Sequence, residues 1–362
     1  MRFIYTLFFL LMSLFFINCK DNSKTKKEII KPKLKALIID GENNHGVWPK
    51  TTFMMKSYLE ETGLFDVDIN RKAFTWIGPH YNPIEGVDDI NDLLTMYPLN
   101  DEVKRTAVDT PMVDPSFSPK FENYDVVISN LGWLSSELPV NTKTSFENYM
   151  KNGGGLVVVH AANNAWGDWD EYNNMIGLGA WGDRDVNSGP YIFYNDKNEI
   201  EHDPSEGICA SHGPQYEYQI KTRAADHPIM KGLPDVWLHT KDELYDRMRG
   251  PGENMTILAT AYSDVERNAP PWMEEVSGTG RHEPMLMAIE YGKGRAFHSA
   301  MGHMDYSFEC VGFTTTFQRG AEWAATGNVT QDIPEDFPSA DSTSSRKWTY
   351  KPLSLIHISE PT

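Results

Sequence analysis

Short apolar runs alternate with amphipathic segments along much of the chain. The runs are four to seven residues long, too short for buried helices and typical of strands covered on both faces. We expect these strands at 34–40, 65–69, 124–129 and 156–160. Helical spacing of apolar residues predicts helices at 48–61, 141–152 and 314–325. Such alternation predicts an α/β fold with a doubly wound, mostly parallel sheet.

The remaining segments predict additional strands and one long insertion. Further strands are expected near 216–221 and 256–262, followed by a hairpin of 285–291 and 295–300 turned at Gly292-Lys293-Gly294. Residues 71–120 are rich in loop-forming residues, with one helix predicted around 91–104. We interpret 71–120 as an insertion into the sheet. No internal repeat and no heptad pattern is present in the sequence.

The N-terminus has the pattern of a processing signal. Arg2 precedes an apolar run from Phe3 to Ile17, and such a run of about 15 residues suits a signal peptide better than a membrane span. Cys19 follows directly, where bacterial lipoproteins are cleaved and lipidated. We therefore expect a signal peptide at 1–18, a polar tether at 19–33 and a lipid anchor on Cys19. The protein would then lie in the cell envelope, on the periplasmic or outer-membrane face. A plain cleaved signal is the alternative.

The C-terminus is expected to lie outside the folded domain. Residues 353–362 resemble the in-frame translation of a sequencing adapter, so His357 is left out of any site argument. An ordinary tail is the alternative. The folded domain is placed at 34–327, with a C-terminal extension at 328–352.

Charge and cysteine content narrow the class of partner. The net charge of −18 and the isoelectric point near 5.0 argue against nucleic acid, and against any membrane contact other than the lipid anchor. Within the folded part only Cys209 and Cys310 occur, and we expect no disulfide between them.

Several histidines follow predicted strands. In open α/β sheets ligands bind at the carboxyl ends of the strands. This rule selects His45 after the first strand, His160 and Asn163 after the fourth, and His303 and Asp305 after the hairpin. We expect these side chains to meet at one edge of the sheet, although a lone histidine is more often structural than catalytic.

The turn after Val159 is where related hydrolases carry a serine or cysteine nucleophile, and here it carries His160. The sequence has no Gly-x-Ser-x-Gly motif, which argues against acyl-enzyme chemistry. An imidazole can act as a general base or bind a metal. Because no compact metal motif such as His-Glu-x-x-His occurs, acid/base chemistry is favoured. No cofactor is predicted, a divalent metal stays open as an alternative, and no phosphate-binding loop is present.

Five segments together resemble the ThuA-like (trehalose utilisation) family over residues 34–327. They are Gly155–His160, Asp226-His227-Pro228-Ile229 with Gly232-Leu233-Pro234, Tyr291–Phe297, Met301–Asp305 and Arg319–Ala325. The resemblance implies a flavodoxin-like, class I glutamine amidotransferase-like fold with helices on both faces of the sheet and no amidotransferase cysteine. It also implies a role with trehalose-type disaccharides, alongside a partner sugar oxidoreductase that forms 3-keto-glycosides. The 71–120 insertion and the Trp-rich 166–191 loop depart from the family, so the substrate is not carried over.

These observations lead to three functional hypotheses. The first is an enzyme, a hydrolase or lyase that acts on a small carbohydrate such as a (3-keto-)glycoside. Its catalytic groups would be His160, His45, His303 and Asp305. Substrate would be bound by Trp166 or Trp169 as a sugar platform, with Asn163, Glu243 and His239. A paired-carboxylate glycosidase mechanism stays open. The second hypothesis is a non-catalytic carbohydrate-binding lipoprotein, and the third is a structural module of a surface assembly.

Overall fold

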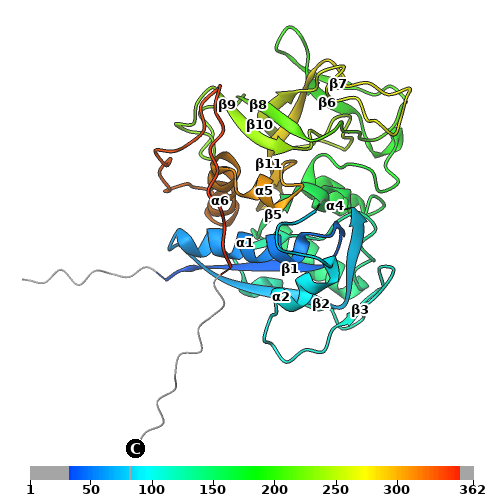
Figure 1. Cartoon of the computed structure of the whole chain (residues 1–362), viewed down its shortest axis with the longest axis vertical. Coiled ribbons are helices and arrows are strands. Elements are labelled where there is room, and N and C mark those ends of the chain that lie inside the picture. Colours follow the sequence, from blue (N-terminus) through cyan, green and yellow to red (C-terminus); the bar gives the residue numbers. More distant parts are fainter. Residues whose placement is uncertain (1–31, 81–82, 351–362) are drawn as a thin grey trace, which may run out of the picture. The chain divides into compact units, whose positions relative to one another are not determined.

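The computed structural model describes residues 32–80 and 83–350. The expected signal peptide, Cys19, almost all of the expected tether and the 353–362 segment lie outside these residues. From Lys33 onward the chain forms one compact unit, which contains the whole sheet (Figure 1). Within the described residues, no helix is both long and apolar enough to cross a membrane.

A single large sheet carries the fold, with strand order β3-β2-β1-β4-β5-β12-β11-β10-β8-β9 and the β6–β7 hairpin attached to β11. The strands are β1 Leu34–His45, β2 Phe65–His80, β3 Thr106–Ala107, β4 Val126–Ser129, β5 Gly155–Val159, β6 Tyr191–Tyr194, β7 Ile200–Asp203, β8 Tyr216–Thr222, β9 Val236–Asp242, β10 Met255–Tyr262, β11 His282–Tyr291 and β12 Gly294–Ser299. The helices are α1 Trp48–Glu61, α2 Leu93–Met96, α3 Val140–Lys151, α4 Asp170–Ile176, α5 Asp305–Phe308 and α6 Val311–Thr326, with short 3-10 turns η1 Ile90–Asp92, η2 Phe121–Asn123, η3 His160–Asn164 and η4 Val186–Ser188.

The sheet has a parallel half and an antiparallel half. Strands β3, β2, β1, β4, β5 and β12 pair in parallel, which confirms the predicted α/β class. From β12 onward, β11, β10, β8 and β9 pair antiparallel. Figure 1 shows β8, β9 and β10 at one end of the sheet and β1 and β2 at the other.

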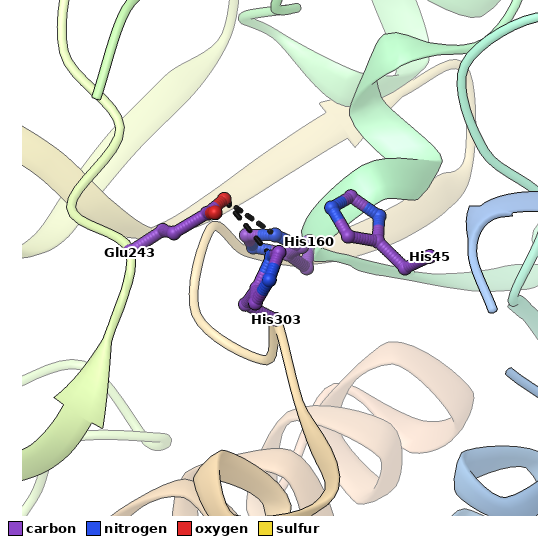
Figure 2. A group of neighbouring side chains, drawn as sticks. All are labelled: His45, His160, Glu243 and His303. Carbon is purple, nitrogen blue, oxygen red and sulfur yellow. Dashed lines mark ion pairs between the residues drawn. The ribbon is translucent and has the colours of Figure 1, made fainter. Parts of the chain in front are cut away.

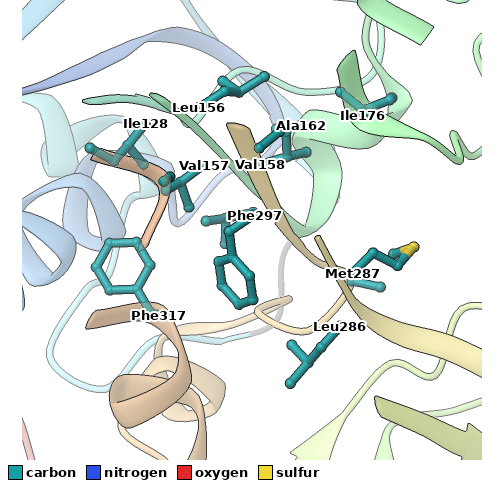
Figure 3. Packing of buried hydrophobic residues seen from close by; sticks show 14 of the residues in the cluster. Ile128, Leu156, Val157, Val158, Ala162, Ile176, Leu286, Met287, Phe297 and Phe317 are labelled. Atoms are coloured by element: carbon teal, nitrogen blue, oxygen red, sulfur yellow. The ribbon is translucent and has the colours of Figure 1, made fainter. Parts of the chain in front are cut away.

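Helices cover both faces of the sheet at the central strands of the parallel half. Every residue of β4 and β5 is buried. At the start of β5, a Cβ on Gly154 would meet Tyr149 of α3, whereas a Cβ on Gly155 would meet Ala324 of α6. Successive residues face opposite sides of a strand, so α3 and α6 lie on opposite faces. Figure 3 shows part of this core, with Phe317 of α6 near Val157 and Phe297.

The antiparallel half curls around α5 and α6, and this curl shapes the site. Helix α6 contacts β5 and β12 and also β9, four strands further along the sheet. A Cβ on Gly312 of α6 would lie 2.2 Å from Cζ3 of Trp237 in β9, so only glycine allows this approach. Because β9 runs in the same direction as β12, its carboxyl end returns to the edge where β1, β5 and β12 end.

Two differences from the sequence predictions concern the segments around β1 and α2. β1 does not end at Asp40 but continues to His45, with register shifts that keep it paired to a longer β2. The polar residues of this extension are buried because they find partners. Asp40 binds Arg71, and Glu42 binds Lys72. The helix predicted at 91–104 is wrong, since only η1 and the single turn α2 form there.

Two further segments complete the description. Cys209 and Cys310 are both free and buried, so the prediction of no disulfide is confirmed. Residues 328–350 have little regular structure but pack on the domain through Val329, Ile333 and Phe337.

Candidate functional site

Four ligand-bearing side chains meet where four strands end. His45 is the last residue of β1, His160 follows β5, Glu243 follows β9 and His303 lies four residues after β12. One nitrogen or oxygen atom from each lies within 4.8 Å of those of the other three, and all four residues are buried. We call this group the His/Glu cluster, and Figure 2 shows its side chains pointing toward one another. The structure thus brings together the three histidines that the strand-end rule selected.

His160 sits in a strained turn that fixes its ring. Its φ of +44° is left-handed, which a residue with a side chain rarely adopts, at the junction of β5 and η3. Its Nδ1 lies 2.8 Å from the carbonyl oxygen of Ala300. A carbonyl only accepts, so Nδ1 carries the proton and Nε2 presents its lone pair to the cluster. Tyr245 donates its hydroxyl proton to that Nε2 at 2.8 Å.

Glu243 is the anion of the cluster. Its Oε2 lies 3.0 Å from His303 Nδ1, 3.5 Å from His160 Nε2 and 3.5 Å from His212 Nε2. Burial alone would raise the pKa of Glu243, but the neighbouring imidazoles hold it well below its usual value. Burial favours neutral His303, yet Glu243 outweighs this and raises the pKa of His303.

A buried carboxylate holds the backbone of the cluster in place. Asp242 accepts hydrogen bonds from the backbone N–H groups of Gly302 at 2.8 Å and His303 at 3.0 Å, tying β9 to the loop after β12. His239 Nε2 bonds the same carboxylate at 2.8 Å. Burial lowers the pKa of His239, but Cys310 and Asp242 together raise it to about 9. His239 is fully buried, so the predicted substrate contact is corrected to a support for Asp242.

A cavity of about 430 Å³ opens above the cluster. It is lined by Asn44, His45, Trp133, Asn164, Trp181, His212, Glu243, Tyr245, Trp272 and His303. Trp272 is 57% exposed and packs against His212 with ring centres 4.8 Å apart and ring planes inclined by 60°, which places it at the mouth. Burial lowers the pKa of His212, against the opposing effect of Glu243. The cavity therefore joins an apolar aromatic wall to a polar, charged floor.

The predicted sugar platform lies elsewhere. Trp166 and Trp169 are 7% exposed and pack on each other and on Tyr172, and neither lines the cavity. Their indole N–H groups donate to Ser136 O and Glu147 Oε1, so both ends of each ring are used by the fold. This prediction is corrected, and Trp133, Trp181 and Trp272 supply the aromatic wall.

Three other predicted residues also do not line the cavity. His160 is one of them, buried behind the lining at 3.5 Å from Glu243. Asn163 is fully buried and donates to His298 Nε2 at 2.9 Å, while its neighbour Asn164 lines the cavity. Asp305 begins α5 and forms an ion pair with Lys50 at 2.6 Å. The predicted catalytic role of Asp305 is therefore corrected to a structural one.

Of the ten lining residues, the predicted site contained only His45, Glu243 and His303. Tyr245 lies two positions after the predicted residue Glu243, so proximity along the chain was an available signal. His212 follows no predicted strand, and the sequence carries no signal for it. Of the described residues, only the His/Glu cluster groups three or more potential metal ligands this closely.

Comparison with known proteins agrees with the fold. The family described as ThuA, trehalose utilisation, matches residues 35–324. A ThuA-like protein from Parabacteroides merdae has 38% sequence identity and a TM-score of 0.69, covering 87% of this chain and 98% of that one. One from Bacteroides uniformis has 18% identity and a TM-score of 0.46, covering 83% and 96%. No curated protein matches significantly. Since the family match takes in nearly all of the described domain, the chain belongs to the ThuA family of trehalose utilisation.

Proposed function

We propose that this protein is an extracytoplasmic enzyme that cleaves or otherwise processes a (3-keto-)glycoside, such as a trehalose-type disaccharide, at the His/Glu cluster. One observation carries the proposal. The imidazoles of His45, His212 and His303 and the buried carboxylate of Glu243 line a cavity whose wall holds three tryptophans. Sugars present C–H faces that stack on indoles and hydroxyls that bind polar groups, so this cavity suits a carbohydrate in both respects.

The residues of the floor fit a reaction that moves protons. Hydrolysis of a glycoside, or elimination from its 3-keto form, requires one group to remove a proton and another to protonate the leaving oxygen. The imidazoles of His160 and His303 lie 3.5 and 3.0 Å from the same oxygen of Glu243, so a proton can pass between this carboxylate and either ring. His212, at the same carboxylate, extends this set toward the cavity mouth.

The test is turnover by the purified full chain with trehalose and with 3-keto-trehalose. Product would be followed by chromatography, and sugar affinity by calorimetry. We expect turnover of at least one of the two, and a loss of about 100-fold or more in Glu243→Gln, in line with general acid/base contributions. Exposed Asp341→Asn is the matched carboxylate control and should keep wild-type turnover.

The second candidate function is carbohydrate binding without catalysis, which the tryptophan wall by itself would also serve. In that case the wild type shows affinity and no turnover. His160→Ala would then leave the affinity unchanged, because a binder needs only the aromatic wall and the amides of the cavity. That pair of results would replace the enzymatic proposal.

A further inference from the structure

We infer that His45, His160, His303 and Glu243 together bind one divalent first-row transition metal ion. The four ligand atoms lie within 4.8 Å of one another. Around a zinc ion with bonds of about 2.1 Å, tetrahedral ligand atoms are about 3.4 Å apart. The separations of Glu243 Oε2 from the nitrogens of His303 and His160, 3.0 and 3.5 Å, bracket that value.

The ring of His160 is already oriented as a metal ligand. Metal-bound histidines almost always donate their second ring N–H to a carbonyl or carboxylate, which fixes the ring and the tautomer. His160 does this through Ala300 and so directs Nε2 into the cluster. Tyr245 lies at the same nitrogen, so its hydrogen bond to Nε2 gives way when a metal binds there.

Two buried polar atoms at the centre of the His/Glu cluster lack a hydrogen bond of good geometry. Glu243 Oε2 and His303 Nδ1 are both buried and neither makes a hydrogen bond of good geometry, although they are 3.0 Å apart. Buried polar atoms are nearly always satisfied, and a metal is a regular partner for converging lone pairs. A metal-free ion pair of Glu243 with protonated His303 is the competing explanation, and the experiment below separates the two.

The donor set narrows the class of metal. Three imidazoles and one carboxylate suit zinc, iron, manganese, cobalt or nickel, whereas calcium and magnesium prefer oxygen ligands alone. The inference deepens the proposed function and rests on it in one respect only, the place of the chemistry. His45, Glu243 and His303 line the cavity, so a cation held by them faces the sugar. There it can polarise a sugar carbonyl or activate a water.

The experiment measures metal binding directly. The full chain, carrying no histidine tag, is stripped with chelator and titrated with Zn²⁺ and separately with Mn²⁺ by calorimetry, with bound metal counted by mass spectrometry. We expect one ion per chain for at least one metal, together with a rise in Tm. His45→Ala, His303→Ala and Glu243→Gln should each weaken affinity about 100-fold or more. His202→Ala, an exposed histidine on β7, is the matched control and should leave affinity unchanged.

The outcomes separate this inference from the proposed function. Less than 0.2 ion per chain for both metals, or equal affinity in wild type and Glu243→Gln with an unchanged fold by circular dichroism, overturns the metal site. Stoichiometric metal that is lost in the cluster variants supports it even when no sugar turns over. Turnover by a chain that binds less than 0.2 ion of either metal overturns the metal site and leaves the proposed function standing.

Discussion

At the scale of single residues, some loop tryptophans pack within the fold and others line the cavity, and the sequence does not distinguish the two groups. Trp166 and Trp169 lie in a polar loop, as sugar-binding tryptophans often do, but the fold uses their faces and their N–H groups. Trp272 keeps 57% of its surface exposed at the cavity mouth. Composition identifies a loop tryptophan, whereas only the folded chain shows which face of its ring is free.

This difference predicts opposite phenotypes for two substitutions. Trp272→Ala should weaken sugar affinity about 5-fold, because a stacking contact contributes about 1 kcal/mol. Its effect on the free energy of unfolding should stay within about 0.5 kcal/mol, since the residue is exposed. Trp169→Phe should lower the free energy of unfolding and have no effect on sugar affinity. Loss of its bond to Glu147 should cost about 1 kcal/mol of stability and leave affinity unchanged. Calorimetric titration and urea unfolding measure both, and wild-type affinity in Trp272→Ala contradicts the assignment.

Because His298 is buried in its neutral form, we expect the free energy of unfolding to fall at acid pH. Its Nδ1–H donates to Ile176 O at 2.9 Å and its Nε2 accepts from Asn163, so the neutral ring is fully satisfied. Burial lowers its pKa to about 4, against 6.5 for an unhindered histidine. Below about pH 6.5 the unfolded chain therefore binds a proton at His298, whereas the folded chain binds this proton only near pH 4. This contribution to stability is present above pH 6.5 and is lost as pH falls to about 4, by up to about 3 kcal/mol.

Urea unfolding between pH 7.5 and 4.5 measures this loss. His298→Gln should lower stability at pH 7.5 but show a shallower decline with acid. His202→Gln, on the exposed strand β7, should keep the wild-type decline. Parallel curves for wild type and His298→Gln would show that another group causes the acid sensitivity.

The residues of the cluster were predictable to the extent that they follow strands. His45, His160 and His303 each come at or after a carboxyl end, and parallel strands bring such ends to one edge. Asp305 passes the same test, but the chain enters α5 there and Lys50 binds its carboxylate. A position after a strand thus predicts that a residue lies at this edge of the sheet. Whether its side chain points toward the site depends on the turn that follows the strand.

At the scale of elements, the sequence predicts those helices and strands whose position depends on the local pattern of apolar and polar residues. Apolar runs located β4 and β5 closely, because burial on both faces demands continuous apolar residues. The extension of β1 to His45 depends on buried ion pairs with β2, and no local pattern contains both partners. The ending of α2 had a local signal that was overlooked. Tyr97 precedes Pro98, and a residue before proline is disfavoured in the helical region.

Because the carboxylate of Asp242 connects β9 to the loop after β12 by hydrogen bonds, we expect its substitution to lower the free energy of unfolding strongly. Its two oxygens accept backbone N–H bonds from Glu243, Gly302 and His303 as well as the bond from His239. In Asp242→Asn one oxygen becomes an amide nitrogen that faces donors, and His239 loses its charge partner. We expect the free energy of unfolding to fall by about 3 kcal/mol or more, the range for breaking one side of a buried ion pair.

Asp305→Asn is the matched control for Asp242→Asn, because it removes a carboxylate at the same end of the sheet. Its partner Lys50 is less deeply buried, with 15% of its side chain exposed, so the loss should be about 1 kcal/mol. Urea unfolding ranks the two. Equal losses would mean that Asp242 does not hold the two segments together.

At the scale of the whole molecule, the compact unit from Lys33 onward contains the sheet, the cavity and the cluster. The expected lipid anchor precedes this unit along the chain. Attachment to the membrane and the chemistry of the site should therefore be separable by substitution. The net charge of −18 gives the chain no electrostatic attraction to an anionic membrane, so any membrane association needs another source.

Cys19→Ser tests this separation. If Cys19 carries the lipid anchor, this substitution removes the site of attachment, and the protein should move from the membrane fraction to the soluble fraction. Sugar affinity of the released chain should equal that of wild type, because no residue of the compact unit has changed. Cys209→Ser is the matched control. That cysteine is free and buried within the domain, so its loss should leave the protein in the membrane fraction. Fractionation with immunoblotting measures both, and a Cys19→Ser protein that stays with the membrane would rule out the anchor.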